Sequence, residues 1–286
     1  MRSYVPAYDL RVPATLEEAL VLLAQEPGRW RPFAGGTDLM VLLEAGRLPH
    51  KEYISLWQLR ELRFIDVHED EVVLGGLTTY TDVLQHGVLS REFPLLCRAA
   101  AETGGVANQN RGTIAGNIAN GSPAADTPPA LLAYDAGLEL VSRRGTRRVA
   151  YERFHTGYKQ MDLAPDELIR AVRLPRSRRS RHQFYRKVGT RRAQAISKIC
   201  LAGVLSLGDG TVEDVRIALG SVAPTVVRAR AAEVALRGQT LDSGARASAR
   251  EALARDIAPI DDIRSTAAYR LEVARNLLDE FLSGAS

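Results

Sequence analysis

The chain has 286 residues, of which 45% are hydrophobic, so two domains with buried cores are the default expectation. The sequence contains no run of about 18 apolar residues and no apolar leader at its start, which predicts a cytoplasmic protein without a membrane span. The formal net charge is only +4, and two cysteines are too few for an iron–sulfur cluster, which normally takes four.

The first elements lead into a glycine pair. Residues 16–25 carry apolar side chains at helical spacing, with Thr15 placed to cap the helix. A short strand over 30–33 then precedes the sequence Ala34-Gly35-Gly36-Thr37-Asp38-Leu39, and 39–45 reads as a short helix. A strand, a Gly-Gly turn and a helix start present backbone N–H groups and a positive helix end to a phosphate.

Asp38 in this first loop (residues 34–39) needs a separate explanation. Its carboxylate would repel a phosphate if it pointed inward. Capping the helix that follows would turn the carboxylate onto backbone N–H groups instead.

Three strands and two helices follow before the next glycine-rich region. The sequence predicts strands over 53–56, 62–67 and 71–77, and helices over 81–85 and 94–102. Residues 104–126, GGVANQNRGTIAGNIANGSPAAD, contain five glycines and no acid before Asp126. We expect a long irregular loop there, since this composition suits neither a helix interior nor an ordinary strand. Bare N–H groups, hydroxyls and amides favour an anionic, phosphorylated ligand.

The remaining elements indicate an α+β fold. We expect a helix after Asp126, a hairpin over 138–150 and a strand over 167–174, followed by two strands and three helices. These last five cover 198–207, 212–220, 228–236, 245–255 and 266–282.

Nine cations and no acid lie between Arg173 and Arg192. Such a run can bind nucleic acid, but two aromatic residues are too few for a base-stacking platform, so we expect no nucleic-acid partner. An interdomain linker with one or two functional cations is the favoured interpretation.

Catalytic machinery is not evident in the sequence. The five histidines are scattered, and we find no metal-ligand spacing, no nucleophile elbow and no Cys–His arrangement. Phosphate-binding loops without acid–base or nucleophilic groups suggest that a cofactor supplies the chemistry.

The two glycine-rich motifs, AGGTDL at 34–39 and GTIAGNIANGSPAAD at 112–126, together resemble the flavin-binding medium subunit of molybdenum hydroxylases, the xanthine dehydrogenase and carbon monoxide dehydrogenase family. Tyr185-Arg186-Lys187 and the tail from Asp262 to Arg270 are similar to further motifs of that family. The resemblance extends over essentially the whole chain.

The resemblance implies a two-subdomain FAD-binding domain of the PCMH/VAO type over 1–176, divided into about 1–56 and 57–176. A basic linker over 177–192 would follow, and then a small α+β domain over 193–286 with a three-stranded antiparallel sheet and helices.

The resemblance also implies a set of FAD-binding residues. The pyrophosphate would lie between residues Ala34 to Leu39 and Thr113 to Asn117. Asp126 would bind the adenosine part, Lys187 would lie on the flavin side, and Ile169 would lie near the ring. The members of this set are Ala34, Gly35, Gly36, Thr37, Asp38, Leu39, Thr113, Ala115, Gly116, Asn117, Asp126, Ile169 and Lys187. Ala115 stands where the family often has glycine, and adds only a methyl group.

The function implied is that of an electron-transfer FAD subunit. Its partners would be a molybdopterin-binding large subunit and a small subunit with 2Fe-2S clusters, in a dimer of heterotrimers, with NAD, a quinone or oxygen as acceptor. An alternative is a self-sufficient FAD-dependent oxidoreductase of the same fold, which would need its own substrate-binding arginines and proton donor. A nucleotide-binding scaffold without redox function is a third interpretation, and the intact loops give no reason to prefer it.

Overall fold

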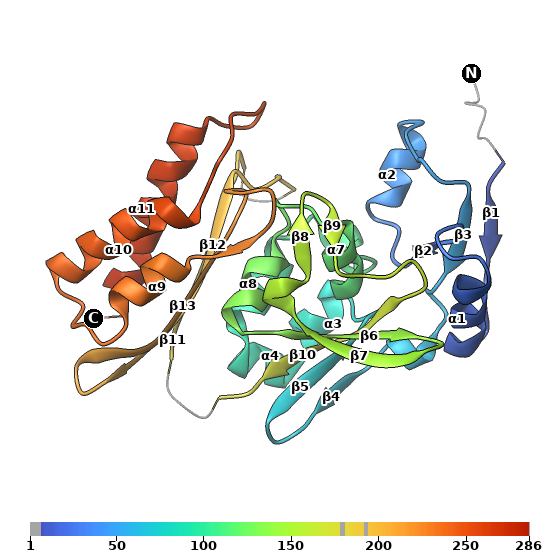
Figure 1. Ribbon diagram of the computed structural model, residues 1–286, viewed down its shortest axis with the longest axis horizontal. Helices are drawn as coiled ribbons and strands as arrows, with labels where there is room; N and C mark the ends of the chain where they lie inside the picture. The colour runs from blue at the N-terminus through green and yellow to red at the C-terminus, as the bar shows by residue number, and fades with distance from the viewer. Residues whose placement is uncertain (1–6, 178–180, 192–193, 286) are drawn as a thin grey trace.

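The computed structural model describes residues 7–177, 181–191 and 194–285. A small parallel sheet, drawn in blue in Figure 1, forms the first layer, with strand order β1-β3-β2. Its elements are β1 (Asp9–Arg11), α1 (Leu16–Gln25), β2 (Arg31–Phe33), α2 (Leu39–Glu44) and β3 (Glu52–Ser55). Helix α1 has the predicted bounds, because Thr15 Oγ1 accepts a hydrogen bond from the Glu18 N–H at 3.2 Å and Leu20 and Leu23 are buried.

A five-stranded antiparallel sheet with order β4-β5-β10-β6-β7 forms the second unit. Its strands are β4 (Ile65–Val67), β5 (Glu71–Gly75), β6 (Gly137–Ser142), β7 (Gly145–Ala150) and β10 (Leu168–Pro175). The helices are α3 (Tyr80–Gln85), α4 (Gly87–Glu92), α5 (Pro94–Glu102), α6 (Val106–Gln109), α7 (Ile114–Asn120) and α8 (Thr127–Ala133), with the short hairpin β8 (His155–Gly157) and β9 (Gln160–Met161), and the 3₁₀ turns η1 (Arg60–Leu62) and η2 (Tyr151–Arg153).

The C-terminal unit has a four-stranded antiparallel sheet, which corrects the three strands implied by the resemblance. The additional strand is β14, a two-residue strand paired with the end of β13. The elements are β11 (His182–Val188), β12 (Ile199–Gly208), β13 (Thr211–Gly220), β14 (Val227–Arg228), α9 (Arg230–Leu236), α10 (Ser243–Asp256) and α11 (Ala267–Ser283).

Strand β11 lies inside the stretch 177–192 that the sequence analysis treated as a linker; residues 178–180 and 192 of that stretch lie outside the described residues. The basic residues of this stretch make it resemble a linker in the sequence, but in the structure the side chains of β11 alternate between two faces. Tyr185 packs into the core shared with the second unit, whereas Phe184 and Val188 pack against the core of the C-terminal unit.

Helix α8 joins the last two units. In Figure 1 it lies between the antiparallel sheet and strands β12 and β13. One hydrophobic cluster contains Leu131 of α8 together with Ala202 and Ala218 of the C-terminal sheet. The two units therefore share a core.

The glycine-rich stretch 104–126 is not one irregular loop, as the sequence analysis expected, because it contains α6 and α7. Thr113 caps α7 and Gly121, with φ of +61°, ends it, so that Gly116 is accommodated within a short helix. Among the described residues, we find no helix with the length and apolar character needed to cross a membrane.

Candidate functional site

The first loop connects β2 to α2 and is shaped by its two glycines. Gly36 has φ of +78°, a conformation that favours glycine. A Cβ atom added to Gly35 would overlap the backbone carbonyl of Arg111, so the loop backbone lies directly against the residue before the second glycine motif. The backbone N–H groups from Gly35 to Asp38 donate no hydrogen bond within the described part of the chain.

Asp38 does not cap α2, so the capping alternative raised by the sequence is not the one adopted. Its backbone is already helical at this position, which places the side chain away from the first N–H groups. Instead, Asp38 Oδ1 accepts a hydrogen bond from Asn120 Nδ2 at 3.4 Å. This contact connects the first loop to the end of α7.

The second glycine motif forms the start of α7. Thr113 Oγ1 accepts a hydrogen bond from the Gly116 N–H at 3.1 Å. A Cβ atom on Gly116 would lie 2.7 Å from that hydroxyl oxygen and 4.0 Å from Ala34 Cβ. Asn117 Oδ1 accepts from the Thr127 hydroxyl at 2.6 Å, which ties α7 to α8. Residues from both predicted motifs thus lie side by side.

The residues of the two glycine motifs can be compared with what a pyrophosphate requires. The unbonded N–H groups of the first loop are donors of the kind that phosphates bind in other loop sites. At the start of α7 the N–H groups of Ile114 and Gly116 are already bonded to Thr78 and Thr113, so this end contributes chiefly the Ala115 N–H. The two glycines Gly35 and Gly116 keep Cβ atoms out of the space where the motifs meet. The residues therefore fit the group.

Asp126 and Lys187 meet in a buried cluster next to α8. Lys187 Nζ donates to Asp126 Oδ2 at 2.7 Å and to the Glu102 carbonyl at 2.9 Å, and the Ser197 hydroxyl donates to Asp126 Oδ1 at 2.7 Å. The side chains are 5% exposed for Lys187 and 10% for Asp126. Burial raises the pKa of Asp126, and the neighbouring ammonium of Lys187 partly opposes that rise. Lys187 is therefore not a solvated linker cation.

The Ile169 carbonyl and the Ala115 side chain both border Gly76. A Cβ atom on Gly76 would overlap the Ile169 carbonyl and lie 3.4 Å from Ala115 Cβ. Both side chains are almost fully buried, at 6% and 9% exposure. They give the second motif an apolar support from β10.

Sequence reasoning missed four residues around these contacts. Glu102 and Ser197 bind Lys187 and Asp126. Arg111 donates to the Gly35 carbonyl, and its guanidinium stacks on the Trp57 ring. Arg111 directly precedes the second motif, which was a usable signal. The other three are brought in by tertiary packing alone.

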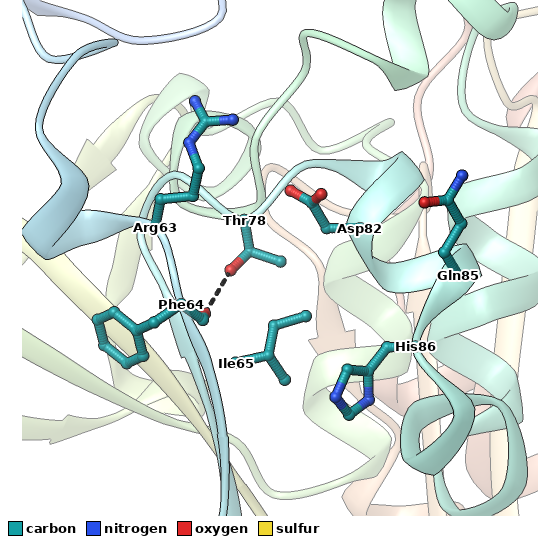
Figure 2. A pocket seen from close by; sticks show the side chains of 7 residues that line it. All are labelled: Arg63, Phe64, Ile65, Thr78, Asp82, Gln85 and His86. Atoms are coloured by element: carbon teal, nitrogen blue, oxygen red, sulfur yellow. Dashed lines mark hydrogen bonds between the residues drawn. The ribbon is translucent and has the colours of Figure 1, made fainter.

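A surface pocket of about 310 Å³ lies elsewhere, between β4 and α3, and contains none of the predicted site residues. Figure 2 shows its lining side chains, with the Thr78 hydroxyl donating to the Phe64 carbonyl at 3.0 Å on its floor. Asp82, which also lines it, accepts from the Thr79 N–H in the capping box of α3. The hydroxyl of Thr78 and the carboxylate of Asp82 thus serve local structure.

Metal-binding groups are not assembled in the described ranges, where no cluster of three or more histidine, cysteine or acidic side chains is close enough to hold an ion. Burial raises the pKa of the Cys97 thiol to about 11 and that of the Cys200 thiol to about 12. Cys200 is a fully buried member of the hydrophobic core and Cys97 packs against that core, so both act as small apolar side chains.

Two family models match the chain. Residues 6–177 match the FAD binding domain in molybdopterin dehydrogenase, and residues 183–285 match the CO dehydrogenase flavoprotein C-terminal domain.

Individual relatives match over nearly the whole length. The xanthine dehydrogenase FAD-binding subunit of Escherichia coli O157:H7 is 32% identical over 274 residues, 95% of this chain and 94% of the relative. The carbon monoxide dehydrogenase medium chain of Hydrogenophaga pseudoflava is 28% identical, covering 98% of this chain and 97% of the relative. Among solved structures, carbon monoxide dehydrogenase from Hydrogenophaga pseudoflava superimposes with a TM-score of 0.92 at 30% identity, covering 97% and 96% of the two chains.

Proposed function

This chain belongs to the family of FAD-binding subunits of molybdopterin dehydrogenases, and from that membership we propose that its two glycine motifs hold the pyrophosphate of FAD. The observation that carries the proposal is the row of unbonded N–H groups from Gly35 to Asp38 beside the amino end of α7. Thr37, Leu39, Thr113 and Asn117 complete the two motifs. Backbone donors of this kind can hold a dianion without an arginine clamp.

Bound FAD supplies the redox chemistry, because it can take up electrons singly and release them in pairs. The chain's own residues bind and orient the cofactor. Ala115 and Ile169 provide an apolar support, while Asp126 and Lys187 provide a buried polar pair. Because these two side chains are hydrogen-bonded at 2.7 Å, we infer that they act as one unit on one part of the cofactor rather than at opposite ends.

The function is therefore electron transfer within a larger enzyme. A partner with molybdopterin oxidises the substrate, a partner with 2Fe-2S clusters delivers the electrons, and this subunit passes them to NAD, a quinone or oxygen. The full-length match to a carbon monoxide dehydrogenase medium chain supports an assembly of this kind, which we propose is a dimer of heterotrimers. That match also favours a subunit over the self-sufficient oxidoreductase considered above.

Domain division and location are also proposals. Because β11 pairs with β12, we place the domain boundary between residues 177 and 182. The two free cysteines are consistent with a reducing compartment, and we propose that the protein is cytoplasmic.

The test is cofactor selectivity of the purified chain. Apoprotein should bind FAD and show flavin absorbance after gel filtration, whereas FMN should not remain bound, because it has one phosphate and no adenosine. Equal retention of FMN and FAD would contradict the assignment of the two motifs to a pyrophosphate.

A further inference from the structure

Arg111 connects the two halves of the candidate site in three ways. Its guanidinium carbon lies 3.7 Å from the centroid of the Trp57 ring. Its Nε donates to the Gly35 carbonyl at 3.4 Å. Its own backbone carbonyl lies so close to Gly35 that a Cβ atom there would overlap it. One residue next to the second motif thus touches the first loop and an aromatic ring.

Trp57 follows β3, the central strand of the parallel sheet, and so lies at the junction between the first and second units. A second guanidinium, that of Arg63, lies 4.4 Å from the same ring centroid. Arg63 also donates to the Trp57 carbonyl at 3.5 Å. Its contacts are local to the segment after β3, and Arg63 lines the pocket of Figure 2 rather than the glycine motifs.

We propose that Trp57 and Arg111 are positioning residues that fix the separation between the two glycine motifs and thereby set the affinity for FAD. This inference rests on the proposed function. Because Arg111 is exposed, the stack adds little to the global core, and its effect is to keep the two backbones in contact before the cofactor arrives. A site that is already arranged loses less free energy to ordering when its ligand binds.

The chemistry of the stack requires arginine. A guanidinium is planar and can stack on an indole while its Nε still reaches a carbonyl, whereas a lysine ammonium is a point charge without a stacking face. Arg111→Lys should therefore behave like Arg111→Ala in FAD binding although it keeps the charge. Trp57→Phe retains an aromatic face and should recover part of the affinity that Trp57→Ala loses.

The experiment measures the FAD dissociation constant and the apoprotein melting temperature of the full-length chain. Trp57→Ala should weaken FAD binding by roughly twofold to fivefold, the range expected for an exposed cation–π contact. Arg111→Ala also loses the hydrogen bond to the Gly35 carbonyl and should weaken binding by roughly fivefold to seventyfold. The double variant should be no weaker than Arg111→Ala, since Arg111→Ala already removes the contact that Trp57→Ala removes. Arg63→Ala is the matched control and should leave the constant unchanged.

Two results would overturn the inference. One is an increase in the FAD dissociation constant of Arg63→Ala equal to that of Arg111→Ala, which would mean that any cation on the Trp57 ring has the same effect. The other is a fall in melting temperature without any change in the dissociation constant, which would leave only a structural role. If the unaltered chain binds no FAD, the proposed function itself fails; if it binds FAD and Arg111→Ala binds equally well, only the positioning role fails.

Discussion

The Lys187 ammonium on β11 donates a 2.7 Å hydrogen bond to the Asp126 carboxylate at the start of α8. The pair crosses the boundary between the two domains, and both side chains are nearly inaccessible to solvent. An ion pair in such a place is sensitive to the loss of one partner, since the remaining charge stays buried.

Lys187→Ala should lower the free energy of unfolding by about 3 kcal/mol at pH 7, the scale for breaking a buried pair. Burial already places the Asp126 pKa above its usual 3.8, and removing Lys187 raises it further. A carboxyl with a raised pKa in the folded state binds more protons folded than unfolded, so stability falls as pH rises through that window. Denaturant unfolding at several pH values should therefore show that the loss of unfolding free energy in Lys187→Ala, relative to the parent chain, becomes larger as the pH rises above about 4.

The neighbouring Arg186 is the control for that experiment. Its side chain lies on the opposite face of β11 from Lys187, is 58% exposed and pairs with Glu280 of α11. Arg186→Ala should therefore change the free energy of unfolding by less than about 1 kcal/mol. Lys187→Ala combined with Asp126→Asn should recover part of the loss. A pH-independent deficit would show that Asp126 is not the group left uncompensated.

Gly35→Ala should weaken FAD binding sharply because the added methyl group overlaps the Arg111 carbonyl and forces the two motifs apart. Fluorescence titration of FAD against the apoprotein measures the effect. Gly87→Ala is the matched control, since the nearest atom to its added Cβ is a flexible Arg91 side-chain nitrogen at 3.6 Å. Normal flavin content in Gly35→Ala would mean that the pyrophosphate does not lie where the motifs meet.

Asp262→Ala should lower the unfolding free energy by about 1 to 2 kcal/mol near neutral pH, a range reduced for partial exposure. The hydrogen bond from Arg270 holds the pKa of Asp262 at about 2, below its usual 3.8. A depressed pKa gives stability that is present above pH 4 and is lost as the pH falls toward 2. The stability curves of variant and parent should therefore converge in acid; a constant offset would rule out the ionised carboxylate as the cause.

The isolated chain should not oxidise purines, aldehydes or carbon monoxide. The two cysteines are side chains of the hydrophobic core, and the described ranges contain no cluster of three or more metal-binding side chains. Anaerobic mixing with each substrate should leave the flavin absorbance unchanged, whereas dithionite should bleach it. Bleaching by a substrate would show that this chain does not depend on partner subunits.

Local signals predicted much of the fold. Helices α1 and α5 have the predicted bounds, because a threonine cap and a proline at the first turn mark their starts. The two glycine motifs were predicted to act together, and the structure places Ala34 within 4.0 Å of the Cβ position of Gly116.

Other features depend on tertiary context. The sequence alone offers no reason for Ser197 to bind Asp126, since packing of β12 beside α8 brings them together. Helix α7 was missed because the glycines of this stretch were taken to indicate a loop, although Thr113 is placed to cap a helix. Strand β11 was missed because the surrounding basic run was given more weight than Phe184, Tyr185 and Val188, whose side chains pack on the two faces of the strand.

The ion pair between Asp126 and Lys187 also has a consequence during synthesis. Asp126 leaves the ribosome 61 residues before Lys187, and at about 5 to 20 residues per second this is a delay of roughly 3 to 12 seconds. Throughout that interval the nascent amino-terminal half carries a carboxylate whose counterion has not yet been made. We therefore expect stalled chains that end before β11 to bind FAD more weakly than the full chain, because the buried cluster around Asp126 lacks Lys187 and Ser197.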